Sequence, residues 1–277
     1  MGKLSPRVLD KIIMERKIAI LGAGGIGSSI ARGIQNSGII KSKIVITREK
    51  SSFSKNEHKM FECYYDNTLA VKHSNIIIVA VQPKQLDNLI EEIKSELTEK
   101  HLVISIVSGV SIERVESLIN KKIPIIRAMP NTAIKTGQSM TCLAFNKLGI
   151  KHQTLVEKIF NSVGITLLVS ESKFAEATVL CGSGPALVLK FIRAYMQACI
   201  QHGFNDKEAL IIAGQVTKGT SMIVQKNNYH PEPEIDKVTT PSGCTIDALV
   251  ELEHRGFSSA LLRSIDAGIK KAKTLYS

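Results

Sequence analysis

Residues 17–33, KIAILGAGGIGSSIARG, decide the fold that this sequence predicts. Four apolar residues at 18–21 run directly into a glycine-rich turn, and Ile26, Ile30 and Ile34 then recur at helical spacing. A strand, a tight turn and a helix form the context in which the pattern G-x-G-x-x-G indicates dinucleotide binding. We therefore expect a Rossmann-type unit at this end of the chain.

Each glycine of the turn has its own physical role. Gly22 permits the tight turn, Gly24 lets the backbone approach a pyrophosphate, and Gly27 lets the helix pack closely on the strand. The first N–H groups of the helix would then face the phosphates. The alternative is a glycine-rich turn in another kind of α/β protein.

Length and charge narrow the function classes. The chain has 277 residues, enough for two domains, and a net charge of +11. Its basic residues are scattered and form no run interleaved with aromatic residues, so we expect no nucleic-acid partner. A basic field suits an anionic cofactor and an anionic small substrate.

The cysteine and histidine spacings indicate no metal site. Five cysteines form no CxxC pair, and the seven histidines are dispersed, which favours a reducing, cytoplasmic location. Residues 1–16 resemble a short amphipathic lead-in helix rather than a secretory signal. The longest apolar stretch, 186–200, contains Lys190, Arg193 and Gln197, so we expect no membrane span.

Strands and helices alternate over the first part of the chain, which predicts a doubly wound, mainly parallel sheet. The expected strands are 17–21, 43–47, 60–64, 76–81, 102–107 and 123–127, with further strands within 138–145 and 165–169. The expected helices between them are 25–37, 83–97, 111–119 and 151–163, with a short one opening at Asp66-Asn67. Ligands of such sheets bind beyond the carboxyl ends of the strands.

From Glu171 onward the pattern predicts helices alone, at 184–203, 206–226, 245–254 and 257–275, with a loop around His230, Pro231 and Pro233. The predicted domains are therefore 1–168, the dinucleotide-binding domain, and 169–277, a helical domain. Within 186–200, 12 of 15 residues are apolar and lie on nearly all sides of the helix. A domain this small cannot bury such a helix alone, so we expect a second copy of the chain to cover it.

The end of the second strand indicates the cofactor type. An acidic residue there would bind the ribose 2′-hydroxyl of NAD. This chain has Thr47 and Arg48, followed by Glu49, Lys50, Ser51 and Ser52, which suit a 2′-phosphate better. We expect NADPH, with NADH as a weaker alternative because of Glu49; a plain polar loop is the remaining interpretation.

The chain resembles the pyrroline-5-carboxylate reductase family over about residues 17 to 275. Besides the glycine turn, the matching motifs are Ala80-Val81-x-Pro83, Ser105-Ile106-x-x-Gly109-Val110, Met129-Pro130-Asn131-Thr132, Gly182-Ser183-Gly184-Pro185-Ala186, Val238-Thr-x-Pro241-x-Gly243-x-Thr245-Ile246 and Gly256-Phe257. The resemblance implies hydride transfer from NADPH to a cyclic imine carboxylate, giving proline. It also implies a helical domain that intertwines into a homodimer, with a decamer of dimers as a larger assembly.

The resemblance also implies site residues. Thr245 would be catalytic, its hydroxyl bonding the ring nitrogen, and the substrate contacts would be Glu171, Lys237, Gly243, Cys244 and Thr245. The cofactor contacts would be Leu21, Gly22, Ala23, Gly24, Gly25, Ile26, Gly27, Thr47, Arg48, Asn67, Ala80, Val81, Gln82, Pro83, Ile106, Val107 and Ser108. Successive N–H groups at a helix start can hold a carboxylate, and the cofactor itself makes the new bond.

Six positions depart from the family pattern. Gln82 stands where the family has a lysine, although Lys84 lies nearby. The other departures are Thr47 for an asparagine, Cys181 for a serine, Leu187 for an aromatic residue, Lys237 for a polar amide and Ser242 for a glycine. Three of them lie near the predicted substrate loop, so a related imine or keto acid stays an alternative substrate. A β-hydroxyacid dehydrogenase would need a catalytic lysine, for which Lys190 is the candidate. A non-catalytic NADPH-binding protein is the third interpretation.

Overall fold

The computed structural model describes residues 15–48, 53–227 and 230–275. The predicted lead-in helix (1–16) and the polar residues Glu49, Lys50, Ser51 and Ser52 lie mostly or wholly outside these ranges. By its contacts the chain forms two compact units, one of residues 1–183 with 271–277 and one of residues 184–270. The predicted domain boundary, 168/169, lies at the end of the last strand, 15 residues before the division between these two units.

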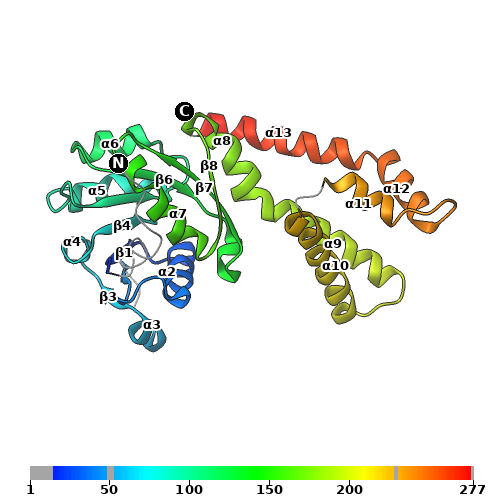
Figure 1. Cartoon of the computed structure of the whole chain (residues 1–277), viewed down its shortest axis with the longest axis horizontal. Coiled ribbons are helices and arrows are strands. Elements are labelled where there is room, and N and C mark those ends of the chain that lie inside the picture. The colour runs from blue at the N-terminus through cyan, green and yellow to red at the C-terminus, as the bar shows by residue number, and fades with distance from the viewer. Residues whose placement is uncertain (1–14, 49–52, 228–229, 276–277) are drawn as a thin grey trace. The chain divides into compact units, whose positions relative to one another are not determined.

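An eight-stranded sheet forms the first unit, in the order β3-β2-β1-β4-β5-β6-β7-β8 (Figure 1). Only β7 runs antiparallel to β6, and every other neighbouring pair is parallel. The strands are β1 (Ile18–Leu21), β2 (Val45–Thr47), β3 (Glu62–Tyr64), β4 (Ile76–Val79), β5 (Leu102–Ser105), β6 (Ile125–Met129), β7 (Ser139–Phe145) and β8 (Gly164–Leu168). The prediction of a doubly wound sheet is confirmed.

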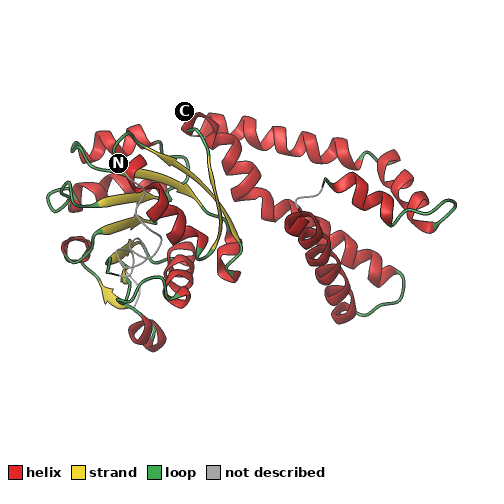
Figure 2. Ribbon diagram, viewed as in Figure 1, coloured by secondary structure: helices red, strands yellow, loops and turns green. Residues whose placement is uncertain are grey.

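Helices cover both faces of the sheet (Figure 2). The helices between the strands and after β8 are α2 (Gly25–Ser37), α3 (Lys55–Met60), α4 (Asn67–Lys72), α5 (Leu86–Ile93), α6 (Ile112–Ile119), α7 (Gln153–Asn161) and α8 (Phe174–Ala177). Along β1, Ile18 and Ile20 pack with α2 and α7, while Ala19 and Leu21 pack with α4, α5 and α6. Burial on both faces explains why the parallel strands read as continuous apolar runs.

Several predicted boundaries were wrong, and a local capping motif explains the first of them. The strand expected at 60–64 begins only at Glu62, because Ser54 and Glu57 form a capping box that starts α3. The strand expected at 76–81 ends at Val79, and residues 83–85 form a 3₁₀ turn before α5. The strand expected at 123–127 lies at 125–129, and the one expected at 102–107 ends at Ser105.

The second unit contains helices alone among its described residues: α9 (Gly184–Gln201), α10 (Asp206–Asn227), α11 (Pro231–Lys237), α12 (Cys244–His254) and α13 (Phe257–Leu275), whose last turn belongs to the first unit. The loop predicted around Pro231 and Pro233 is wrong, because these residues start α11. A proline costs nothing in the first helical turn, and His230 caps the helix by accepting from the Glu232 N–H.

The second unit has very little core of its own. Of its described residues, three apolar ones are buried, Cys199, Ala209 and Ala213, whereas Leu189 and Leu262 are 61% and 65% exposed. The helical run 171–201 is long and apolar enough, by length and composition alone, to cross a membrane, and 11% of its apolar window is buried. So much exposed apolar surface requires a partner of some kind.

Replacing Gly27 with alanine is expected to weaken NADPH binding about tenfold, because the change disturbs the glycine turn. A Cβ on Gly27 would lie 2.5 Å from the carbonyl oxygen of Gly22, so α2 would have to move away from the turn. Equilibrium binding of NADPH, followed by nucleotide fluorescence, measures the effect. Gly219→Ala on α10 is the matched control, since no atom lies near its Cβ position and it is not among the predicted cofactor residues, and equal losses in both variants would contradict the steric argument.

Candidate active site

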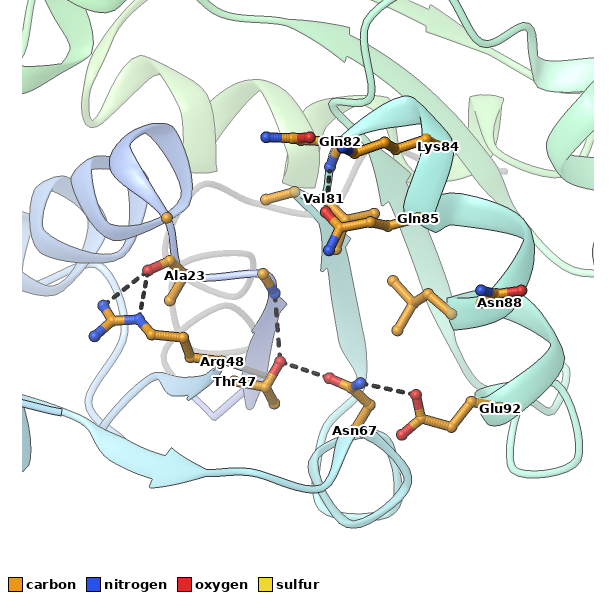
Figure 3. A pocket seen from close by; sticks show the side chains of 14 residues that line it. Ala23, Thr47, Arg48, Asn67, Val81, Gln82, Lys84, Gln85, Asn88 and Glu92 are labelled. Carbon is orange, nitrogen blue, oxygen red and sulfur yellow. Dashed lines mark hydrogen bonds between the residues drawn. The ribbon is translucent and has the colours of Figure 1, made fainter. Parts of the chain in front are cut away.

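A cavity of about 780 Å³ opens beyond the carboxyl ends of β1, β2 and β4 (Figure 3). Nine predicted cofactor residues line it: Gly22, Ala23, Gly24, Thr47, Arg48, Asn67, Ala80, Val81 and Gln82. This is the edge at which ligands of open α/β sheets bind. The predicted residues thus meet in one cavity, and their contacts with a cofactor stay predictions.

The turn at the floor of this cavity needs glycine for steric reasons. Gly22 has a φ of +91°, and a Cβ there would come within 2.7 Å of the Val81 side chain. Gly24, in contrast, has open space where a Cβ would lie, so its bare backbone faces the cavity. These features fit a dinucleotide pyrophosphate approaching the N-terminus of α2.

A hydrogen-bonded chain runs along the cavity wall from β1 to α5 (Figure 3). The Gly22 N–H donates to Thr47 Oγ1 (3.3 Å), and the Thr47 hydroxyl donates to Asn67 Oδ1 (2.6 Å). The Asn67 amide in turn donates to Glu92 Oε2 (3.0 Å). Thr47 has thus used its only proton within the protein, so toward a ligand its oxygen can act only as an acceptor.

Arg48 is held over the glycine turn by several contacts. Its Nε and Nη2 donate to the Ala23 carbonyl oxygen at 3.1 and 2.8 Å, and Nη2 also donates to Glu57 Oε1 at 2.7 Å. The guanidinium lies 4.8 Å from the centre of the Phe53 ring. Such contacts fix the orientation of the guanidinium before any ligand binds.

The carboxyl group of Glu57 stabilises this arrangement. Its burial acts to raise its pKa, but hydrogen bonds from Arg48 and from the backbone and hydroxyl of Ser54 outweigh burial and hold the pKa at about 2. Because the folded-state pKa lies below the ordinary value of 4.5, Glu57 stabilises the folded chain above that pH. The stabilisation is lost as the pH falls from 4.5 toward 2.

We expect Glu57→Gln to reduce this pH dependence. At pH 7 the variant should be less stable by up to about 3 kcal/mol, and the difference from the unchanged chain should shrink as the pH falls below 4.5. Urea unfolding at several pH values measures it. Glu91→Gln is the control, because Glu91 is 71% exposed in its pair with Lys94, and a constant difference between pH 7 and pH 3 would contradict the assignment.

Five further residues line the cavity that the sequence did not predict: Lys84, Gln85, Asn88, Leu89 and Glu92. Four of them, at positions 85, 88, 89 and 92, recur at helical spacing, which is the sequence pattern that could have identified them. This spacing places the start of α5 and one of its faces at the carboxyl end of β4. Lys84 supplies the same cavity with a cation where Gln82 replaces the lysine expected from the resemblance.

The remaining predicted cofactor residues lie around the cavity rather than in its lining. Leu21 is fully buried in β1, Val107 is also buried, and Gly27 packs against Gly22. Ile26 is 43% exposed on the first turn of α2, and Gly25 borders a second cavity of about 800 Å³ along that helix. Pro83, Ile106 and Ser108 follow the ends of β4 and β5, and their cofactor contacts stay predictions.

Four predicted substrate residues lie in the second unit, around the N-terminus of α12. Gly243 is the residue that precedes this helix, and Cys244 and Thr245 begin it. A turn leads into it, in which the Gly243 N–H donates to the Thr240 carbonyl at 3.1 Å. Lys237 ends α11 and pairs with Glu234 at 2.6 Å. Among the described residues, the Thr245 hydroxyl has no hydrogen-bond partner.

Ser242 adopts an unusual backbone conformation in this turn. Its φ is +57°, in the left-handed region that favours glycine, which is the residue expected there from the resemblance. Pro241 and Ser242 thus occupy the positions that proline and glycine prefer in a type II turn. A Cβ on Gly243 would collide with the Thr240 hydroxyl, so glycine is required at position 243 even though position 242 carries a serine.

The fifth predicted substrate residue, Glu171, lies in the first unit and has protein partners. Its Oε1 accepts from the Ile112 N–H at the start of α6 (2.6 Å) and from Arg127 Nη1 (3.2 Å). Arg127 is buried against the Phe174 ring, 4.3 Å from its centre. Glu171 therefore ties the segment after β8 to the sheet, and its contact with substrate stays a prediction.

Comparison with known proteins identifies relatives of the whole chain. Residues 17–109 match a family described as NADP oxidoreductase, coenzyme F420-dependent, and residues 171–275 match one described as pyrroline-5-carboxylate reductase dimerisation. Pyrroline-5-carboxylate reductase 2 of Dictyostelium discoideum is 41% identical over 93% of this chain and 92% of its own length.

Two other relatives extend this comparison. Pyrroline-5-carboxylate reductase 1 of the same organism is 42% identical over 96% of this chain, which spans 51% of that protein's length. A crystal structure of Plasmodium falciparum pyrroline carboxylate reductase with NADP bound superposes with a TM-score of 0.86 at 27% identity, covering 96% of this chain and 100% of that one.

Proposed function

This chain belongs to the pyrroline-5-carboxylate reductase family, and from that premise we propose how it reduces 1-pyrroline-5-carboxylate to L-proline with NADPH. This is the last step of proline biosynthesis, catalysed by an oxidoreductase that acts on CH–NH groups. The observation that carries the proposal is the cavity beyond β1, β2 and β4, with its bare glycine turn and fixed Arg48.

Bound NADPH supplies the hydride in this reaction. The residues of the first unit hold it: the glycine turn and the N-terminus of α2 take the pyrophosphate, and Arg48 takes the 2′-phosphate. Beside these phosphates, the Thr47 oxygen accepts a hydrogen bond from the cofactor, because its own proton is donated to Asn67. The Asn67 amide, which donates to Glu92, also donates to the cofactor. NADH lacks the 2′-phosphate and therefore binds more weakly.

The turn before α12 holds the substrate. The N–H groups of Cys244 and Thr245 bind the carboxylate at the start of an 11-residue helix, where the helix dipole also favours an anion. The Gly243 N–H closes the turn on the Thr240 carbonyl and so shapes this binding position. The Thr245 hydroxyl donates to the ring nitrogen as it gains electron density during hydride transfer. Lys237 adds a positive charge close by in the sequence, and a substrate contact of Glu171 belongs to the proposal on the resemblance alone.

A direct assay tests this function. The protein is mixed with NADPH and pyrroline-5-carboxylate, and the absorbance of the reduced nicotinamide is followed, with proline measured as the product. A keto acid offered in place of the imine distinguishes a related reductase, including one that would use Lys190. Retained NADPH binding without oxidation by any of these substrates would indicate the non-catalytic alternative.

The helical domain associates with a second copy of the chain. Its exposed apolar residues, such as Leu189 on α9 and Leu262 on α13, are the surface that a partner would bury. The larger decamer of dimers and the cytoplasmic location both belong to the proposal. The assembly is supported by the resemblance, and the location by five cysteines that form no CxxC pair.

We expect Leu262→Lys, alone or with Leu189→Lys, to shift the assembly toward monomers, because burying a lysine charge in an apolar interface is costly. Size-exclusion chromatography with light scattering measures the mass and also separates a dimer from larger rings. Ser117→Lys, which adds the same charge to exposed α6 in the first unit, should leave the mass unchanged. A dimer that survives both interface changes would place the interface elsewhere.

A further inference from the structure

Two cysteines that the proposed reaction does not use lie in direct contact in the first unit. Cys142 is on β7, and Cys181 is in the π-helical segment 178–183. Their sulfur atoms are 3.4 Å apart, with the Cys142 thiol donating to Cys181 Sγ. The two positions are far apart in the sequence, so the fold itself brings the sulfur atoms together.

The two thiols differ in their surroundings. Cys142 is 1% exposed within the apolar layer that includes Met129 and Phe174, whereas Cys181 is partly exposed at the edge of that layer. A thiol that a reagent can reach, next to a buried second thiol, is the arrangement of an oxidisable cysteine with its resolving partner.

We infer that Cys142 and Cys181 form a peroxide-reactive dithiol, a site of reversible covalent modification separate from the reductase chemistry. The thiolate of Cys181 attacks the O–O bond of hydrogen peroxide, which gives a sulfenic acid on Cys181 and water. The Cys142 thiol then attacks that sulfur and displaces its hydroxyl as a second water. Overall, two thiols are oxidised to one disulfide while one peroxide is reduced to two waters, and an external dithiol reverses the change.

Electrostatics assigns the first step to Cys181. The hydrogen bond from Cys142 stabilises negative charge on Cys181 and, against the opposing effect of burial, lowers its pKa to about 7. The same pairing, together with burial, raises the pKa of Cys142. Near neutral pH, therefore, Cys181 supplies the thiolate and Cys142 the thiol.

The backbone around Cys181 positions its sulfur atom. The Asn131 side-chain amide donates to the Cys181 carbonyl oxygen at 3.0 Å, and the Asn131 backbone N–H donates to the Ser139 hydroxyl at 3.0 Å. These bonds fix segment 178–183 against β7. A disulfide requires the sulfurs to approach to bonding distance, which a small side-chain rotation can supply from 3.4 Å.

Peptide mapping of the intact enzyme tests the site. The full chain is treated with a small molar excess of hydrogen peroxide, free thiols are blocked, and the digest is analysed by mass spectrometry. The expected result is one peptide pair joined through Cys142 and Cys181, formed within a single chain and removed by dithiothreitol. Oxidation confined to the exposed Cys244, with Cys142 and Cys181 both recovered as free thiols, would overturn the inference.

Two variants separate the roles of the pair. In Cys142→Ala, sulfenic acid on Cys181 should persist and be trapped by dimedone, whereas Cys181→Ser should lose both the disulfide and the dimedone adduct at this site. Cys63→Ser is the control, because burial raises the pKa of that thiol and the disulfide should still form. Equal dimedone labelling of Cys181 before and after loss of Cys142 would contradict a resolving role for Cys142. If either variant fails to fold, the peptide mapping of the unchanged chain still shows whether the disulfide between Cys142 and Cys181 forms.

Discussion

Thr245→Ala is expected to lower kcat for pyrroline-5-carboxylate about 100-fold while leaving the KM for NADPH unchanged. The Thr245 hydroxyl has no hydrogen-bond partner among the described residues and lies on the first turn of α12, so its removal takes away a donor without breaking a structural bond. Loss of one donor directed at charge that develops in the transition state costs on the order of 10²–10³ in kcat.

Steady-state kinetics with both substrates measures this effect. Thr245→Ser should recover most of kcat, because it restores the hydroxyl without the methyl group. Thr220→Ala is the matched control, since it removes a threonine from exposed α10 whose hydroxyl already donates to the Val216 carbonyl. If Thr245→Ala turns over as fast as the unchanged enzyme, the hydroxyl does not contact the reacting nitrogen.

Arg48→Ala is expected to reduce the preference for NADPH over NADH by about 10- to 100-fold. A charge-assisted hydrogen bond contributes about 1.5–3 kcal/mol, which corresponds to that range, and only NADPH offers the 2′-phosphate. The KM for NADPH should rise, and the KM for NADH should change little.

The ratio of kcat/KM for the two cofactors is the measurement. A loss of stability lowers kcat/KM for both cofactors equally and therefore leaves this ratio unchanged. Such a loss is expected because the buried Glu57 carboxylate no longer has its arginine. Arg114→Ala is the control, because Arg114 also pairs with a carboxylate, Asp87 at 2.6 Å, but on the exposed surface outside the cavity. An equal loss for NADPH and NADH would mean that Arg48 does not contact the 2′-phosphate.

The first unit was largely predictable because its signals are local. Helix α2 begins at Gly25 and ends at Ser37, as predicted, since glycines bound it on both sides and Gly38 adopts the left-handed conformation. The apolar runs identified the strands, although their last residues turn out of the sheet to form the cavity edge, as at residues 80–82. Apolar runs cannot show where pairing stops.

Other features depend on contacts that no single stretch contains. Helix α3 is not among the predicted helices, although Ser54 and Glu57 have the spacing of a capping box, and the bond of Glu57 to Arg48 could not be predicted because it joins two elements. The role of Glu171 against Arg127 and α6, and the contact between Cys142 and Cys181, likewise arise from residues far apart in the chain. The sequence predicts a loop at Pro231, where the structure starts a helix, because proline is common both in loops and in the first turn of helices.

The small core of the helical unit has a consequence for how the enzyme should be handled. The three buried apolar residues among its described positions cannot offset the conformational entropy of ordering this unit, so its folding free energy comes largely from association. The unfolding midpoint of these helices should therefore depend on protein concentration, rising as the enzyme becomes more concentrated, while the sheet unit melts at a nearly constant temperature. Diluted stocks would then lose activity through unfolding of the helices first.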